Sequence, residues 1–234
     1  ELQKVKAHIA LHQVYGVDLN PTAVELAEIS LWLDTMTSQL KAPWFGLHLR
    51  RGNSLIGALR STYSSAQLKK REWLSSVPRR EPVQNLAEAI DAGETKDINA
   101  AGRIHQFLVP SSTWGAAADA KDLKKLAADE IKAMKAWRRS VTGKAPTKEQ
   151  AKRLTNLAAR VESLWAITLS KMRIAEEQIR RDIDLWGRET EHTAKNVRRE
   201  QIERELLHDA EGAYLRLRLV MDAWNALTLS LIHI

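Results

Sequence analysis

A long apolar repeat in the second half of the chain constrains its fold more than any other feature. Apolar or small side chains recur there at alternating steps of three and four residues. They are Leu154, Leu157, Val161, Leu164, Thr168, Met172, Ala175, Ile179, Ile183 and Trp186. Because an α-helix turns once every 3.6 residues or so, this spacing puts them on one face. The repeat predicts a helix over 148–186 with a seam like that of a coiled coil.

Polar residues mark the helix ends around this repeat. A preceding helix is expected from near Asp119, as its cap, to about Val141, followed by a turn at Gly143. Thr147 and Gln150 have the spacing of a capping box, in which each side chain satisfies a backbone N–H at the start of the helix. Because only a short turn joins the two helices, we expect them to form a long antiparallel hairpin.

A third helix is expected from near Ala194 towards Trp224. Its packing face should consist of Val197, Ile202, Leu206, Ala213, Leu217 and Met221. Residues 214–220 also alternate as a strand would, so the local pattern allows both structures. We favour a helix because both flanks are helical.

The first 60 residues carry alternating helix and strand patterns. Helices are expected over 1–12 and 22–36, with short strands before Asp18 and around 47–49. Asn20 can cap the second helix, and Pro21 suits its first position. The expected apolar faces are Leu2, Val5, Ile9 and His12 on the first helix, and Val24, Ala27 and Leu31, flanked by Ile29 and Leu33, on the second. This pattern is typical of a Rossmann-like α/β segment.

These patterns together predict a predominantly α chain in successive segments. A partial Rossmann-like segment over 1–60 leads into 61–118, where prolines and glycines predict loops and short helices. The helical segment over 119–228 contains the hairpin and the third helix. Residues 229–234 resemble the translation of a transposon-end adapter used in sequencing libraries, and residue 1 is Glu rather than Met. We therefore interpret the chain as an internal fragment.

Composition narrows the class of protein. No apolar run reaches the roughly 20 residues of a membrane helix, so we expect no membrane association and a cytoplasmic location. The absence of cysteine excludes disulfides and thiolate metal sites. A net charge of +7 favours polyanionic partners such as nucleic acid, although a solvated helical surface would produce part of the same excess.

Two polar elements follow the expected strands of the first segment. Asp18 follows an apolar run, and a carboxylate at a strand's carboxyl edge can accept hydrogen bonds from both hydroxyls of a ribose. The competing interpretation is a turn residue next to the helix cap Asn20. Asn53 and Ser54 lie in a second strand-to-loop element, where Asn53 could accept a hydrogen bond from an adenine amino group or simply form a turn. Because Ala58 and Leu59 replace the lysine and hydroxyl of a phosphate loop, we exclude a nucleoside triphosphatase.

Other motifs have ordinary structural interpretations. His8 and His12 share a helical face but lack the glutamate of a zinc hydrolase, so we expect no metal site there. The eight tryptophans fall mostly in helical segments and are expected to be packing anchors. The basic pairs at 138–139, 180–181 and 198–199 could follow a phosphate backbone or form a solvated face.

Two sequence blocks together resemble a known enzyme family. They are Tyr15-Gly16-Val17-Asp18-Leu19-Asn20-Pro21-Thr22-Ala23-Val24-Glu25-Leu26-Ala27, with Ser30-Leu31-Trp32-Leu33 after it, and Arg50-Arg51-Gly52-Asn53-Ser54-Leu55-Ile56-Gly57. In order and spacing they resemble the large adenine-specific DNA methyltransferases. These are the type IIG restriction-modification enzymes and the phage-defence methylases of BREX and DISARM systems. The helical stretch from residues 174–176 through to residues 218–224 resembles the defence-system branch most.

The resemblance implies a binding site for S-adenosylmethionine. Asp18 would hydrogen-bond the ribose of the cofactor and Leu19 would pack against its adenine. Asn53 would contact the adenine amino group, with Ser54 beside it. In this family the methyl group passes to the exocyclic amine of an adenine flipped out of the DNA duplex.

Two motifs of the family are missing from this sequence. They are the glycine-rich loop that holds the methionine end of the cofactor and the Asn-Pro-Pro-aromatic catalytic loop, since the only Asn-Pro is Asn20-Pro21, followed by Thr22. By the family's motif order the first would precede Glu1 and the second would follow about Leu229. We therefore expect part of a cofactor site and no catalytic residues.

Three hypotheses follow. The first is a fragment of a DNA adenine methyltransferase whose basic helical insertion contacts double-stranded DNA or subunits of a defence complex. The second is a non-enzymatic helical scaffold or nucleic-acid-binding module in which Asp18 only supports a turn. The third is a nicotinamide-dependent oxidoreductase, because NAD-binding folds also place an acid on a ribose. The element around Gly52 and the helical extension do not resemble that third class.

Overall fold

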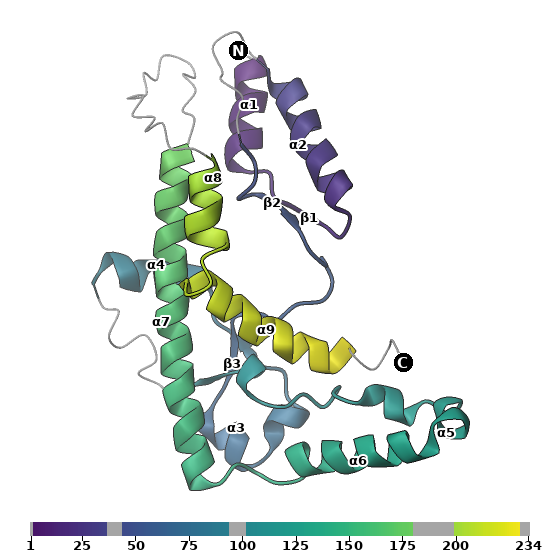
Figure 1. Cartoon of the computed structure of the whole chain (residues 1–234). Coiled ribbons are helices and arrows are strands. Elements are labelled where there is room, and N and C mark those ends of the chain that lie inside the picture. Colours follow the sequence, from purple (N-terminus) through teal and green to yellow (C-terminus); the bar gives the residue numbers. More distant parts are fainter. Residues whose placement is uncertain (1, 37–43, 94–101, 180–198, 230–234) are drawn as a thin grey trace. The chain divides into compact units, whose positions relative to one another are not determined.

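The protein is predominantly helical and divides into two compact units in a computed structural model (Figure 1). The structure describes residues 2–36, 44–93, 102–179 and 199–229. Unit 1 comprises Glu1–Ile56 and Ser170–Asp209, and unit 2 comprises Gly57–Leu169 and Ala210–Ile234. None of the helices in the described ranges combines the length and the apolar character that crossing a bilayer requires.

Unit 1 begins with a small α/β arrangement. Its elements are α1 (Leu2–His12), β1 (Gly16–Asp18), α2 (Pro21–Thr35) and β2 (Leu49–Arg51). The strands pair in parallel, with Gly16 opposite Leu49 and Asp18 opposite Arg51. A parallel pair needs a crossover, and the connection through α2 supplies it. These four elements were all expected from the sequence.

The predicted start of α2 is confirmed, and the predicted apolar faces are confirmed in part. The Asn20 side chain accepts a hydrogen bond from the Thr22 N–H at 3.0 Å, and Pro21 is the first helical residue. Val24, Ala27 and Leu31 pack on a core of Ala10, Phe45 and Leu49. The flanking residues Ile29 and Leu33 are exposed, as are Leu2 and Ile9. The face of α1 was therefore predicted wrongly, because its small residues Ala7 and Ala10 are the buried ones.

A second cluster of unit 1 joins helices from the later part of the sequence. It contains the last turns of α7 (Lys148–Ile179), α8 (Arg199–Ile202) and the π-helix η5 (Glu203–Leu207). Ala175, Ile202 and Leu206 form its core, and Trp44, Leu47, Met172 and Leu207 pack against them. The predicted packing positions Ile202 and Leu206 are confirmed.

Unit 2 contains a small antiparallel sheet that the sequence did not predict. Its strand order is β4 (Arg79–Arg80), β3 (Ser61–Tyr63), β5 (Ile104–His105). The expected short helices are present as α3 (Ser65–Lys69), η1 (Glu72–Leu74), α4 (Val83–Asp91) and η3 (Gln106–Leu108). Strands of two or three residues are too short to show an alternating pattern, so nothing in the sequence distinguished them from loops.

The helices that lead to α7 differ from the prediction. In place of one helix from Asp119 there are η4 (Ala116–Asp119), α5 (Leu123–Leu126) and α6 (Ala128–Thr142). Asp119 does not cap α6, since α6 begins only at Ala128. Its carboxylate instead accepts hydrogen bonds from Arg138 Nη1 at 2.7 Å and Nη2 at 3.0 Å. Within unit 2, α6 runs at a steep angle to the first part of α7 (Figure 1). The expected antiparallel hairpin is therefore wrong.

The start of α7 and much of its seam agree with the prediction. The Thr147 N–H donates to Gln150 at 2.9 Å and the Gln150 N–H donates to Thr147 Oγ1 at 3.2 Å, which confirms the capping box. Val161, Thr168 and Ala175 are buried as expected, whereas Leu157 is 41% exposed. The predicted part of this helix beyond residue 179 lies outside the described residues.

The predicted third helix is interrupted. The π-helix η5 ends at Leu207, and α9 (Ala213–Leu229) begins only after a break of several residues. The alternative of a strand over 214–220 is wrong, because these residues are helical. Leu217 and Met221 pack with Phe107 and Val161 as predicted for a helix. Residues 194–198, including Val197, are outside the described part of the chain.

Two tryptophans join α9 to the middle of unit 2. Trp224 Nε1 donates to the Val109 carbonyl at 2.9 Å, and Trp114 Nε1 donates to the Trp224 carbonyl at 3.2 Å. Trp73 is buried with Tyr63, Leu68, Ile104, Val109 and Ala158 in a neighbouring cluster. For these three tryptophans the prediction of packing anchors is confirmed.

Candidate functional site

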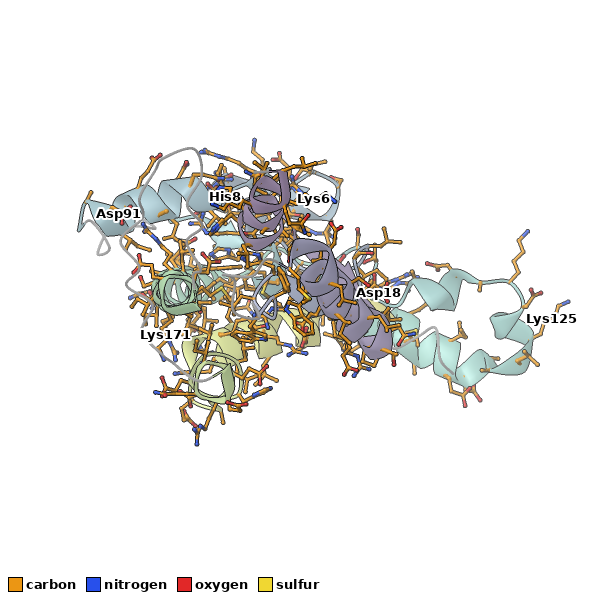
Figure 2. All side chains as sticks on the ribbon, turned by 90° about the horizontal axis from the view of Figure 1, so that it is seen from above. Lys6, His8, Asp18, Asp91, Lys125 and Lys171 are labelled. Atoms are coloured by element: carbon orange, nitrogen blue, oxygen red, sulfur yellow. The ribbon has the colours of Figure 1, made fainter. Side chains whose placement is uncertain are left out.

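Asp18 is the last residue of β1 and lies just before α2 (Figure 2). Its Oδ1 accepts a hydrogen bond from the Asn20 N–H at 2.8 Å, and its backbone carbonyl accepts one from the Gly52 N–H at 2.9 Å. The side chain is exposed, and within the described residues no hydrogen bond occupies Oδ2. One carboxylate oxygen thus fixes the turn into α2, while the other remains available to a ligand.

Asn53 lies in the loop that follows β2. Its Oδ1 accepts hydrogen bonds from the Leu55 N–H at 2.8 Å and the Ile56 N–H at 3.0 Å. The carbonyl oxygen therefore already has two donors, as in an Asx turn. The two amide hydrogens of Asn53 have no acceptor within the described part of the chain. Asn53 thus forms the turn that was its alternative interpretation, and only its amide hydrogens remain without a described partner.

The strand register brings the four expected cofactor residues to one edge of the sheet. Asp18 is opposite Arg51 in the parallel pair, and Asn53 comes two residues after Arg51. Leu19 and Ser54 are the next residues on each side, so all four lie in the loops at the carboxyl ends of neighbouring strands. Leu19 is 67% exposed. In open α/β sheets this edge is where ligands bind.

A buried polar network in unit 2 was not predicted. Glu162 of α7 lies 2.7 Å from Arg60 Nη2 through Oε2 and 2.9 Å from His105 Nε2 through Oε1. The side chains of Arg60, Glu162 and His105 are 9%, 6% and 0% exposed. Burial raises the pKa of Glu162, but the close contacts with His105 and Arg60 outweigh burial and lower it.

A second set of polar contacts adjoins this network on the same sheet. Thr62 Oγ1 donates to Glu81 Oε1 at 2.7 Å, and Arg103 Nε lies 2.6 Å from Thr62 Oγ1 and 3.1 Å from Glu81 Oε1. Arg60 Nη1 also donates to the backbone carbonyls of Glu81 and Pro82. The cations and carboxylates thus lie next to one another inside the unit, but Arg60 Nε and His105 Nδ1 have no hydrogen-bond partner within the described residues. We interpret the contacts among Arg60, Glu162 and His105 as structural, because these three side chains are closed off from solvent.

The sequence could not reveal these partners. Arg60, Glu162 and His105 are far apart along the chain and match no spacing motif. Glu162 follows the predicted seam residue Val161, but Arg160 precedes the same residue and is exposed. The position of Glu162 in the sequence therefore did not distinguish a buried charge from a solvated one.

Other predicted features gave no further site. His8 and His12 have ring centroids 4.6 Å apart, and the described residues contain no group of three or more metal-ligating side chains. The basic residues Arg180, Arg181 and Arg198 lie outside the described part of the chain, as does the Arg199 side chain. Their expected contact with DNA stays a prediction.

Comparisons with protein-family models, with curated proteins and with solved structures found no match. The residues and geometry of the β1–β2 edge are therefore what indicates a function for this chain.

Proposed function

We propose that this chain is a fragment of an S-adenosylmethionine-dependent DNA methyltransferase that modifies the exocyclic amine of adenine. The observation that carries the proposal is the position of Asp18 and Asn53 in the loops after two neighbouring parallel strands. In a Rossmann-like segment these loops bind the ribose and the adenine of a nucleoside cofactor. The two sequence blocks that resemble the methyltransferase family include these two loops.

The contacts of each side chain support a specific role. Asp18 Oδ2 would accept a hydrogen bond from a ribose hydroxyl, while Oδ1 continues to hold the turn at Asn20. The exposed Leu19 would cover one face of the adenine. Since the Asn53 carbonyl is engaged by Leu55 and Ile56, Asn53 would donate its amide hydrogens to a ring nitrogen of the adenine rather than accept from the amino group. Ser54 would lie beside it.

The remaining steps of the reaction would belong to the parent enzyme. We propose no catalytic residue in this chain, because it contains no Asn-Pro-Pro-aromatic loop to hold the target amine. Double-stranded DNA would be the substrate, the cytoplasm the location, and subunits of a restriction or phage-defence complex the protein partners. The net charge of +7 supports an anionic partner.

The alternative is a helical scaffold in which Asp18 only supports the turn into α2. The hydrogen bond from the Asn20 N–H to Asp18 Oδ1 favours this alternative, since it gives the carboxylate a structural role without any ligand. A nicotinamide-binding protein would use the same carboxylate. The three proposals predict different ligands for the complete protein. The methyltransferase binds S-adenosylmethionine, the oxidoreductase binds NAD, and the scaffold binds neither.

The test is Asp18→Ala in the complete protein that contains this segment, with cofactor binding measured by isothermal titration calorimetry. Loss of a charged hydrogen bond should weaken S-adenosylmethionine binding by about 1.5–3 kcal/mol. Asp34→Ala is the matched control, because Asp34 belongs to the same unit and, among the described residues, its carboxylate pairs at the surface with Lys6. Unchanged affinity in a folded Asp18→Ala protein would favour the scaffold, and selective binding of NAD would favour the oxidoreductase. The flanking reading frame provides a second test, since it should encode the two missing loops.

A further inference from the structure

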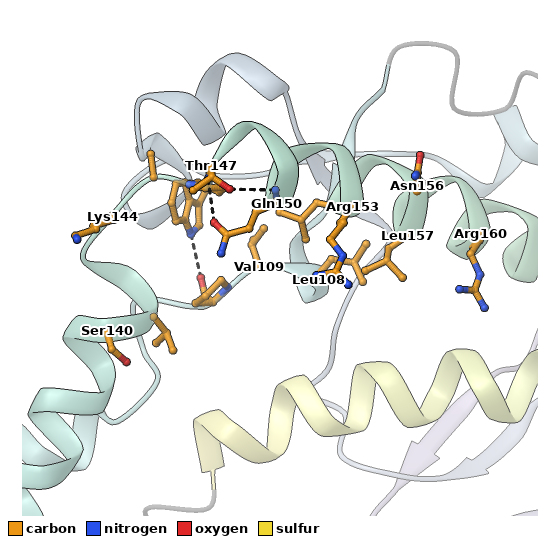
Figure 3. A pocket seen from close by; sticks show the side chains of 16 residues that line it. Leu108, Val109, Ser140, Lys144, Thr147, Gln150, Arg153, Asn156, Leu157 and Arg160 are labelled. Atoms are coloured by element: carbon orange, nitrogen blue, oxygen red, sulfur yellow. Dashed lines mark hydrogen bonds between the residues drawn. The ribbon is translucent and has the colours of Figure 1, made fainter.

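Unit 2 contains a groove of about 960 Å³ where the end of α6, residues 108–110 and the first turns of α7 meet (Figure 3). Its floor is apolar and consists of Trp73, Leu108, Val109, Pro110, Leu154 and Leu157. Leu157 is the predicted seam residue that α7 leaves 41% exposed. Two residues of the predicted seam of α7, Leu154 and Leu157, thus line this groove. No helix in the described part of the chain covers Leu157.

The charged residues around this floor all have one sign. Lys144, Arg153 and Arg160 line the groove, and its lining contains no Asp or Glu. The three side chains are exposed, and none of them forms an ion pair with another described residue. By contrast, Arg138 nearby is held by Asp119 at 2.7 Å. Unpaired cations beside apolar surface leave a local charge that a ligand can complement.

The cations of α7 alternate with its apolar side chains along one face. Arg153, Leu157 and Arg160 follow the steps of four and three residues that place side chains on one side of a helix. Figure 3 shows these three side chains on the same side of α7, with Asn156 on the opposite side. At about 1.5 Å per residue, the two arginines are about 10 Å apart along the helix axis.

We propose that this groove binds an acidic amphipathic segment of a partner protein. Apolar side chains of that segment would cover Leu157 and the floor, and its carboxylates would pair with Arg153, Arg160 and Lys144. Helix-in-groove recognition has this combination of apolar anchors and complementary charge. Nucleic acid fits the groove less well, because a phosphate backbone would have to lie against an apolar floor that offers it no hydrogen bonds. The proposal goes beyond the methyltransferase function and does not depend on it.

The test uses the 234-residue chain and a fluorescein-labelled peptide of about 15 residues, or roughly four helical turns, with Leu on one face and Glu on the other. Fluorescence polarisation should give a Kd of about 1–100 µM. A peptide with Lys in place of Glu and a peptide with the Leu positions scrambled should bind at least about tenfold more weakly.

Charge-reversing variants locate the binding surface. Arg153→Glu combined with Arg160→Glu should weaken binding of the acidic peptide by about tenfold or more. Lys148→Glu combined with Lys152→Glu is the matched control on α7, since neither lysine lines the groove, and it should change Kd by less than about twofold. Circular dichroism and thermal unfolding show that each variant is folded. A variant that retains its helicity but not its affinity supports the proposal.

Three results would overturn it. The first is no binding of the acidic peptide, and the second is equal weakening by the two double variants. The third is that the Arg153/Arg160 variant loses affinity for a 20-base-pair DNA duplex but still binds the acidic peptide. That result would identify the groove as a nucleic-acid contact.

Discussion

Glu162 on α7 accepts a hydrogen bond from Arg60 at 2.7 Å, although the two residues are 102 positions apart in the chain. The second carboxylate oxygen lies 2.9 Å from His105 on β5. Arg60 directly precedes β3, and His105 belongs to β5. The carboxylate of Glu162 therefore connects α7 to the start of β3 and to β5. The geometry makes Glu162 a central polar contact inside unit 2.

Glu162→Gln should destabilise the protein. The neutral side chain would leave the Arg60 guanidinium buried without a countercharge, and breaking a buried pair in this way costs about 3–5 kcal/mol. The free energy of unfolding from urea titration measures the change. Glu177→Gln, an exposed position on the same helix, is the control and should stay within about 0.5 kcal/mol of the unmodified chain. A loss below about 1 kcal/mol for Glu162→Gln would show that solvent reaches Arg60.

The contribution of Glu162 should depend on pH. His105 and Arg60 lower its pKa in the folded protein below the ordinary value of 4.5, despite the opposite effect of burial. A lowered carboxyl pKa stabilises the folded state above the unfolded-state pKa, and that stabilisation is lost as the pH falls through the folded-state pKa. The difference in unfolding free energy between the unmodified chain and Glu162→Gln should therefore be constant near neutral pH and shrink in acid. A difference that grows below pH 4.5 would contradict the lowered pKa.

Leu217→Ala and Leu219→Ala should differ strongly in their effects. In a strand these residues would share a face, but in α9 Leu217 is 3% exposed and Leu219 is 58% exposed. Truncating the buried leucine should cost about 2–5 kcal/mol, because it leaves a cavity beside Phe107 and Val161. The exposed leucine should cost about 0.5 kcal/mol or less. Thermal unfolding of both variants provides the measurement, and equal losses would be inconsistent with the helix.

The features that sequence predicted well have short-range causes. The Asn20 cap and the Thr147–Gln150 box depend on residues within one helical turn, so local chemistry is enough to identify them. The Ile202, Leu206 and Leu217 packing positions follow from helical periodicity. The edge that holds Asp18 and Asn53 was also expected, because turn residues end both strands.

The features that sequence did not predict depend on distant partners. Aspartate is a common helix-capping residue, but the carboxylate of Asp119 instead binds Arg138. Arg138 lies 19 positions away, so the residues around Asp119 do not predict this contact. Helix α6 is held by the contacts of Arg138 with Asp119 and of Trp137 with Trp114, which the short turn at Gly143 does not reveal. For Asn53 the sequence indicated a polar contact, whereas the direction of its hydrogen bonds required the positions of the Leu55 and Ile56 amides.

The contact between Glu162, Arg60 and His105 also constrains how this protein can evolve. A single replacement at any of the three positions leaves a buried polar or charged group without its partner, which destabilises the fold. Joint replacement of the three residues by apolar residues of similar volume leaves no such unpaired group. Descendants of this sequence should therefore change positions 60, 105 and 162 in concert, and substitution at one of them should be accompanied by compensating substitution at another.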